Sequence, residues 1–422
     1  MTTDAARASA ADSEGRAKRA NEYRAIAVVS LAHFVNHFHY LVLPPLFPLL
    51  KTQFGIGFVE IGFALTVGSV LSVAAQLPIG FLVDRVGSRR MLVLGLVTSS
   101  LAFISFGLSP CYSRLLLATA LLGLASSVFH PADYAILAVR ITPARVGRAF
   151  SIHTFSGFLG SAIAPVAMLS AATSLGLECA VIAAGSIALV AALPLILARG
   201  VDNIPAVAFP YLATAGPRAG VAAILTPTII GLTGFFALLS LSGSGISNFS
   251  VVALTTAFGT PLSVASLALT GYMGAQALGV LAGGFIADMT RRHAEVAAVG
   301  YAVNACFVLA IGTIGFGSVP LVAAMCCAGL LSGLIMPSRD MLVRAAAPRG
   351  AVGRTFGIVT SGFNLGGMVG PLMFGYILDR AAPQWVFGAS VIIMILTSTV
   401  ALIGDRRSTR QHRALGVSEA AE

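Results

Sequence analysis

The stretch Gly-Phe-Leu-Val-Asp-Arg-Val-Gly-Ser-Arg-Arg at residues 80–90 decides the fold of this chain. It joins two long apolar runs, at residues 56–83 and 91–109. A weaker copy, Gly-Phe-Ile-Ala-Asp-Met, lies at residues 284–289, about 204 residues later, and also ends a long apolar run. A polar turn that recurs between hydrophobic segments indicates a duplicated helical unit.

The duplication extends well beyond this turn. Phe-His-Pro-Ala-Asp at residues 129–133 aligns with Ile-Met-Pro-Ser-Arg at 335–339, and Val-Gly-Arg-Ala-Phe at 146–150 aligns with Val-Gly-Arg-Thr-Phe at 352–356. Both pairs share one offset of about 206 residues, without a gap. The chain therefore consists of two similar halves in parallel repeat, the design of many secondary transporters.

The composition places both halves in a membrane. Hydrophobic residues make up 57% of the 422 residues and charged residues only 10%, against about 25% charged residues in a soluble domain. The apolar runs are also too long for the alternating ~10-residue strands of a transmembrane barrel. At about 20 residues per helix, we predict twelve spans, at 24–50, 56–83, 91–109, 113–139, 148–172, 177–198, 224–250, 262–287, 296–315, 318–345, 354–378 and 384–404.

The predicted fold class is an all-α membrane protein with twelve transmembrane helices in two pseudo-symmetric six-helix bundles. Residues 24–198 form the first bundle and 224–404 the second, and the polar stretch 199–223 is a cytoplasmic linker. Residues 1–23 are polar and basic, so we expect a disordered cytoplasmic tail there, and 405–422 form a second cytoplasmic tail.

The basic residues predict the orientation. Of the 26 lysines and arginines, all but Lys51, Arg114 and Arg380 fall on the side that holds the N-terminus. Cytoplasmic loops carry such an excess of basic residues, so both termini are expected in the cytoplasm and the protein in the inner (cytoplasmic) membrane. The net charge of +10 is thus a topology signal rather than a nucleic-acid surface.

We expect no cofactor and no metal. The five cysteines lie in or beside apolar runs, lack metal-ligand spacing, and are interpreted as small packing residues. His33 and His37 could offer two ligands, but the sequence holds no second ligand cluster. Membrane lipid, a small-molecule substrate and protons are the expected partners, and the protein is expected to be a monomer.

The turn at 80–90, together with twelve spans and a duplicated half, resembles the signature loop of the major facilitator superfamily across residues 24–404. Two further stretches resemble its fosmidomycin-resistance branch: His-Phe-Val-Asn-His-Phe-His-Tyr at 33–40, followed by Pro-Pro-Leu-Phe-Pro at 44–48, and Phe-His-Pro-Ala-Asp at 129–133. The resemblance implies a transporter in which spans 4 and 10 flank a central cavity.

In this superfamily the signature loop holds the two halves together on the cytoplasmic side. The resemblance therefore implies a cytoplasmic gate in which a glycine permits close helix approach, an acid accepts hydrogen bonds and the arginines form ion pairs. The alternative is a basic turn that only fixes topology. The residues assigned to this gate are Gly80, Asp84, Arg85, Arg89, Arg90 and Asp288.

Charged residues inside spans are costly and normally face a cavity or a partner. Asp133 and Asp340 are the acids well inside predicted spans, and the repeat aligns Asp133 with Arg339. We predict that Asp133 and Arg339 approach each other across the cavity when its cytoplasmic mouth closes. The alternative is pairing within each half, for instance between Asp340 and Arg344.

Polar residues in spans 1, 4 and 11 complete the predicted substrate or proton pathway. His33 and His37 share one helical face, and imidazoles titrate near neutral pH, which suits proton coupling or a polar substrate site. Helix–helix hydrogen bonding is the alternative, and His153 is interpreted as a packing residue. The predicted pathway residues are His33, Asn36, His37, His130, Asp133, Arg339, Asp340 and Asn364.

The predicted function is secondary transport of a small polar or anionic organic molecule by alternating access, coupled to protons, with export favoured. A proton-driven importer of an organic acid is the alternative. Two residues depart from the family's antiporter motifs, Ala164 and Thr119, which argues against the familiar proton/drug route. The sequence shows no nucleotide-binding loop or nucleophile–base pair and leaves no room for a signalling domain, so an enzyme, an ATP-driven pump and a sensor are disfavoured.

Overall fold

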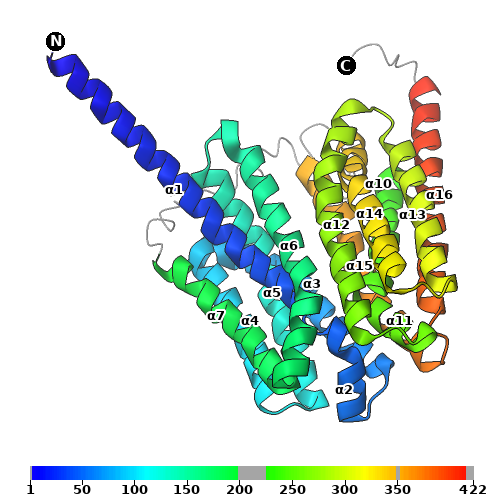
Figure 1. Ribbon diagram of the computed structural model, residues 1–422. Helices are drawn as coiled ribbons and strands as arrows, with labels where there is room; N and C mark the ends of the chain where they lie inside the picture. The colour runs from blue at the N-terminus through cyan, green and yellow to red at the C-terminus, as the bar shows by residue number, and fades with distance from the viewer. Residues whose placement is uncertain (1, 198–224, 348–351, 415–422) are drawn as a thin grey trace.

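The computed structural model describes residues 2–197, 225–347 and 352–414, and the regular elements in these ranges are helices. Figure 1 shows them as two groups side by side. The first group contains α1 (Thr2–Tyr40), η1 (Pro44–Leu46), α2 (Phe47–Phe54), α3 (Phe58–Val86), α4 (Ser88–Leu108), α5 (Tyr112–Arg140), α6 (Pro143–Leu175) and α7 (Leu177–Leu197).

The second group repeats this arrangement. It contains α10 (Pro227–Ser244), η3 (Gly245–Phe249), α11 (Ser250–Phe258), α12 (Leu262–Met289), α13 (His293–Thr313), α14 (Ser318–Ala346), α15 (Val352–Asp379) and α16 (Trp385–Ala414). The first span of each half is interrupted. In the first half, α1 ends at Tyr40 shortly before Pro44 and Pro45, because a proline has no backbone N–H to donate to a continuing helix. In the second half, a single π-helical turn at η3 separates α10 from α11.

Twelve helical segments cross the molecule. Among the described residues, eleven segments satisfy the length and hydropathy of a membrane span. Helix α15, whose hydropathy is diluted by Gly, Asn and Pro, is the remaining long segment and brings the second half to six. The predicted fold class, an all-α membrane protein of two six-helix halves, is confirmed.

Close glycine contacts show the duplication in three dimensions. A Cβ on Gly123 of α5 would collide with the backbone of Gly68 on α3, and a Cβ on Gly329 of α14 would collide with the backbone of Tyr272 on α12. The repeat relates the two contacts, because it aligns Gly123 with Gly329 and Gly68 with Tyr272, at the offsets of about 206 and 204 residues given above. Equivalent helices therefore meet at equivalent points, where only glycine permits the approach.

The terminal segments differ from the prediction. The disordered tail expected at residues 1–23 is wrong, because α1 is helical from Thr2. Alanine, arginine and glutamate favour helix there, and buried Glu22 pairs with Arg145 of α6 at 2.9 Å. At the other terminus α16 continues to Ala414, ten residues into the predicted tail. The linker 199–223 lies outside the described residues.

The two halves are joined far from the termini. The carboxylate of Asp379, at the end of α15, accepts the backbone N–H groups of Phe58 and Val59 at the start of α3, at 2.9 and 2.8 Å. Lys51 adds an ion pair to Asp379 at 3.4 Å. Nearer the middle, the hydroxyl of Thr66 donates to the carbonyl of Met368 at 2.8 Å. These contacts hold the two halves together at and near the end of the molecule where α3 begins and α15 ends.

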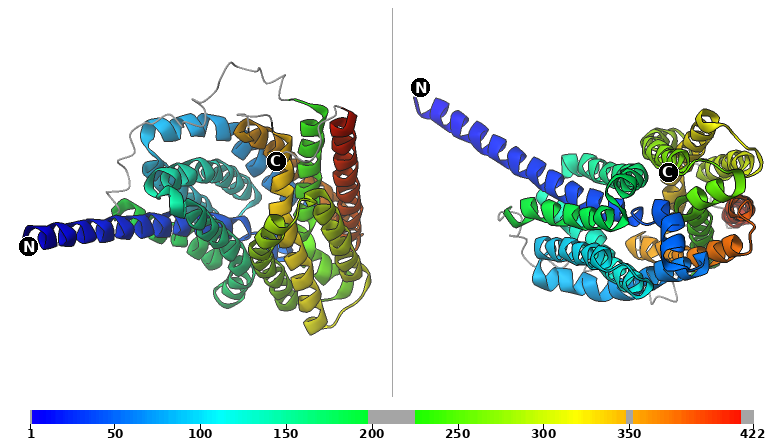
Figure 2. Two further views of the ribbon diagram at one scale, coloured as in Figure 1. Left: turned by 90° about the horizontal axis from the view of Figure 1, so that it is seen from above. Right: turned by 60° about the horizontal axis from the view of Figure 1, so that its bottom comes forward.

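The start of α1 and the end of α16 both lie at the end of the molecule opposite to Asp379 (Figure 1), as an even number of spans requires. The views in Figure 2 show the two halves as separate groups of helices. Helices α3 and α12, whose ends bear the repeated turn, end there with exposed Asp84 and Asp288. In this conformation, hydrogen bonds and an ion pair close the molecule at the end away from the termini.

Candidate functional site

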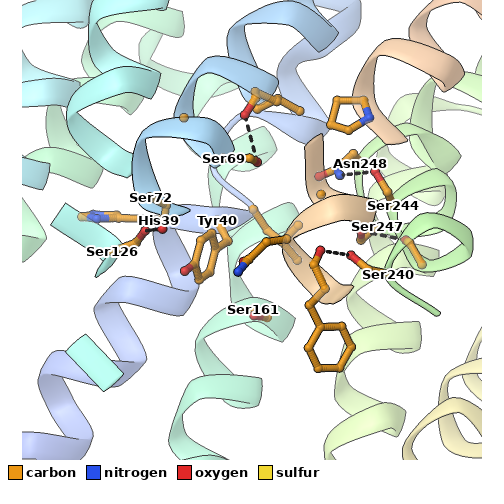
Figure 3. A pocket seen from close by; sticks show the side chains of 18 of the residues that line it. His39, Tyr40, Ser69, Ser72, Ser126, Ser161, Ser240, Ser244, Ser247 and Asn248 are labelled. Atoms are coloured by element: carbon orange, nitrogen blue, oxygen red, sulfur yellow. Dashed lines mark hydrogen bonds between the residues drawn. The ribbon is translucent and has the colours of Figure 1, made fainter. Parts of the chain in front are cut away.

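A cavity of about 500 Å³ lies between the two halves. Helices α1, α3, α4, α5 and α6 line it from the first half, and α10, η3, α12, α13, α14 and α15 from the second. Figure 3 shows side chains from both halves pointing into it. A site shared by two repeats that can move against each other is what alternating access requires.

Most of the polar side chains in the cavity wall carry hydroxyl groups. Some of the serines among them donate to a carbonyl of their own helix, as Ser69 does to Leu65 and Ser126 to Gly123, so their oxygens stay available as acceptors. Sequence reasoning missed them, because an isolated serine in an apolar helix carries little signal until the fold gathers several on one wall. The lining serines are Ser69, Ser72, Ser99, Ser126, Ser161, Ser240, Ser244, Ser247 and Ser332.

Amide and phenol groups add to this wall. Of the predicted pathway residues, Asn36 and Asn364 line the cavity, and the buried amide nitrogen of Asn36 has no partner among the described residues. Gln276 donates to Ser332 at 3.1 Å and Asn248 to Ser244 at 3.1 Å. Further lining residues that the prediction omitted are His39, Tyr40, Tyr272 and Tyr301.

Arg339 is the one charged side chain among the described residues that line the cavity. Its Nε bonds Asp340 Oδ1 at 3.0 Å, and its guanidinium carbon lies 5.0 Å from the ring centres of both Phe236 and Phe363. The side chain is 11% exposed. In the described structure its Nη atoms make no hydrogen bond, so a planar, prepositioned donor pair faces the cavity.

The environment of Asp340 differs from the prediction. Asp340 pairs with Arg339 rather than with Arg344, and its side chain is 47% exposed and does not line the cavity. Asp340 therefore neutralises part of the arginine charge without contacting the cavity.

A second polar site lies inside the first half, outside the cavity lining. The buried carboxylate of Asp133 on α5 lies 3.1 Å from His33 Nδ1 on α1 and 3.6 Å from His153 Nε2 on α6. The His33 ring centre is 4.5 Å from that of His37 and 5.4 Å from that of His130. We call these five residues the His–Asp cluster. Contrary to the expectation of packing, His153 belongs to it, and its ring nitrogens make no described hydrogen bond.

Three residues of the His–Asp cluster offer donor atoms close enough together to hold a metal ion. One donor atom each from His33, Asp133 and His153 lies within 4.8 Å of the others, and all three side chains are buried. Imidazole and carboxylate are zinc ligands. The short His33–Asp133 contact is also an ordinary hydrogen bond, so a divalent ion there would have to displace it.

Asp133 and Arg339 do not meet in this conformation. Asp133 is fully buried against the histidines of its own half, while Arg339 bonds Asp340 and faces the cavity. The predicted approach of Asp133 and Arg339 concerns the state in which the cavity is closed at the end that holds the termini, and for that state it stays a prediction.

The predicted gate residues lie at or near the ends of α3, α4 and α12 that are on the side of the termini. Asp84 and Asp288 are exposed, and a Cβ on Gly80 would meet open space, so the close approach expected at Gly80 is wrong for this conformation. Arg89 donates to the carbonyls of Leu195 and Ile196, at 2.9 and 3.0 Å, within its own half. Arg85 and Arg90 are exposed beside it.

Two relatives match this chain over different lengths. The fosmidomycin resistance protein of Escherichia coli (strain K12) is 22% identical over 395 residues, which is 92% of this chain and 95% of that protein. A Na(+), Li(+), K(+)/H(+) antiporter of Planococcus maritimus is 35% identical over 112 residues, 25% of this chain and 26% of that protein.

Solved structures show the same fold. A bacterial homologue of the human lysosomal transporter Spinster, in an inward-facing and unoccupied conformation, superposes with a TM-score of 0.77 at 15% identity, covering 92% of this chain and 97% of that one. The nucleoside transporter NupG (D323A mutant) superposes with a TM-score of 0.72 at 13% identity, covering 91% and 99%.

The family model of the Major Facilitator Superfamily matches residues 29–241 and 230–419, one match for each half. The two matches overlap at residues 230–241, within α10, and the Escherichia coli relative agrees with the branch that the sequence motifs resemble. The chain belongs to the major facilitator superfamily.

Proposed function

We propose that the protein is a secondary active transporter that exports a small polar or anionic organic molecule by alternating access, in exchange for protons. The observation that carries this proposal is the cavity between the halves, with many hydroxyl groups and a single charged lining residue, Arg339, among the described residues. Such a wall suits a small cargo with one anionic group and several hydrogen-bonding groups. The cargo crosses unchanged, since no reaction is needed for passage.

Direction and coupling draw support from the relatives. The Escherichia coli relative is named a resistance protein, which favours export, and the Planococcus maritimus relative is named an antiporter that exchanges ions for H⁺. One chain supplies both walls of the cavity, which favours function as a monomer. The proposal is tested by a thermal-shift screen of purified protein against fosmidomycin and small organic anions, because a ligand stabilises the state that it binds.

The proposed orientation gives the first testable prediction. With cytoplasmic termini, reporters fused before Thr2 and after Ala414 should both report the cytoplasm, and a reporter inserted at Thr260, between α11 and α12, should report the exterior. The excess of basic residues near the termini is the physical reason. Reporters on the two termini that give opposite signals would contradict the twelve-span topology.

The proposed coupling gives the second prediction. We propose that His37, His130 or Asp133 carries the proton, because each of these groups adjoins the buried His33, and the exposed His130 gives the cluster access to solvent. Single variants His37→Ala, His130→Ala and Asp133→Asn should lose the dependence of transport on an imposed pH gradient while ligand binding persists. Transport into everted vesicles with and without the gradient measures this.

The matched control is His293→Ala, a histidine at the start of α13 in the other half. It should keep gradient-driven transport. A chelator on both sides of the membrane should change nothing, since the proposal needs no metal. If all three cluster variants keep full gradient-driven transport, the coupling ion is not a proton at this cluster.

A further inference from the structure

One face of α6 connects the His–Asp cluster to the cavity. His153, Gly157 and Ser161 are spaced four residues apart and so share this face. His153 adjoins Asp133. A Cβ on Gly157 would lie 2.7 Å from His33 Cδ2 and 3.0 Å from His37 Cδ2, so α6 packs directly against both imidazoles. Ser161 Oγ lies 3.4 Å from His37 Nδ1.

Ser161 is the point where the two sites meet. It lines the cavity, whereas His33, His37, His130, Asp133 and His153 are not among the lining residues. The next residue, Ala162, faces α12 of the other half, where a Cβ on Gly274 would lie 3.8 Å from the Ala162 Cβ. A chain of contacts therefore runs from Asp133 to His33 by a hydrogen bond, from His33 to His37 by ring contact, and from His37 to Ser161, beside the interface between the halves.

The hydroxyl of Ser161 can respond to the state of His37. In the neutral tautomer that carries its proton on Nε2, the bare Nδ1 of His37 accepts a hydrogen bond from the hydroxyl, whereas Nδ1 of the protonated imidazolium donates to Oγ instead. In the second case the hydroxyl hydrogen is released toward the cavity or toward the His37 carbonyl, which is 3.4 Å away. The groups that face His37 and Asp133 are the other cluster histidines with Tyr40 and Tyr134.

We propose that Ser161 is the positioning residue through which the protonation state of the His–Asp cluster acts on the cavity and on the contact between the halves. This inference rests on the proposed proton coupling. Within the cluster, Asp133 and His33 form the buried end and His37 contacts Ser161. The change in the hydrogen bonding of Ser161 then alters how α6 packs against the other half. A serine that only packed α6 against α1 would not affect any response to pH.

The test measures how far the two halves separate at the end that holds the termini, and it needs no substrate. Spin labels on Arg148→Cys and Arg291→Cys, exposed residues near the termini on α6 and beside α12, report the separation of the halves in a variant without native cysteines. In the otherwise unchanged protein, distance distributions from pH 5 to pH 8 should show a change in the ratio of open to closed molecules. With Ser161→Ala this change should shrink about fivefold, the equivalent of one hydrogen bond.

Two controls make the result specific. Ser161→Thr keeps a hydroxyl and should restore the response. Ser151→Ala removes an exposed hydroxyl of α6 that bonds its own helix and does not line the cavity, and it should leave the response unchanged. If the protein with Ser161 shows no pH response, the proposed proton coupling fails. If it responds and Ser161→Ala responds equally, the coupling stands and the role of Ser161 is overturned.

Discussion

Replacing Asp379 by alanine is expected to open the end of the molecule that lies away from the termini, by an amount on the order of 100-fold in the ratio of open to closed molecules. The Asp379 carboxylate serves as the missing N-cap of α3: Gly57 precedes that helix and offers no side-chain cap, and the N–H groups of Phe58 and Val59 donate to Asp379 instead. A cap supplied by one half to the other joins them only while this end is closed.

The magnitude follows from what is lost. Two hydrogen bonds to a charged acceptor at a helix N-terminus contribute about 2–4 kcal/mol together. The Lys51–Asp379 ion pair contributes less, because the Lys51 side chain is 42% exposed and water screens the pair. Lys51→Gln is therefore the matched control, and it should shift the same ratio by less than about fivefold.

The measurement is labelling of a cavity cysteine from outside the cell. Ser247→Cys, introduced without the native cysteines, places a thiol in the cavity. A membrane-impermeant maleimide added outside should label it much faster in the Asp379→Ala background than with Asp379 present, and only slightly faster with Lys51→Gln. Equal labelling rates in all three backgrounds would show that Asp379 does not hold this end closed.

Arg339→Gln is expected to weaken binding of an anionic ligand about 100-fold and to abolish transport at low ligand concentration. Arg339 is the one charged side chain in the described cavity wall, and its Nη groups are free to form a bidentate, charge-assisted pair. Arg339→Lys should not restore affinity, because the flat guanidinium lies over the neighbouring rings of Phe236 and Phe363, where an ammonium group offers neither the fork nor the stacking.

Ligand-induced stabilisation in the thermal-shift assay measures this loss, with fosmidomycin or whichever anion raises the melting temperature most. Ser240→Ala is the matched control. It alters a neutral lining residue whose hydroxyl bonds the Phe363 carbonyl at 2.7 Å, and it should cost about tenfold at most. Unchanged binding in Arg339→Gln would show that the cargo is not recognised as an anion.

The sequence by itself determined the class of protein and its internal symmetry. The length of the apolar runs follows from membrane thickness, and the repeated turn at 80–90 and 284–289 follows from the two halves having the same fold, so both are visible without coordinates. Intramembrane charge also identified Asp133 and Arg339 as unusual, because a charge in a span is costly wherever it points.

Tertiary structure alone decided how the polar residues are divided between two sites. Asn36, Arg339 and Asn364 face the cavity, whereas His33, His37, His130 and Asp133 lie together in the first half, joined by His153. Helical spacing fixes which residues share a face but not what that face meets. The serine-rich wall and the Asp379 cap of α3 likewise join residues up to 321 positions apart. Such contacts depend on how whole helices pack, and no local pattern in the chain encodes that.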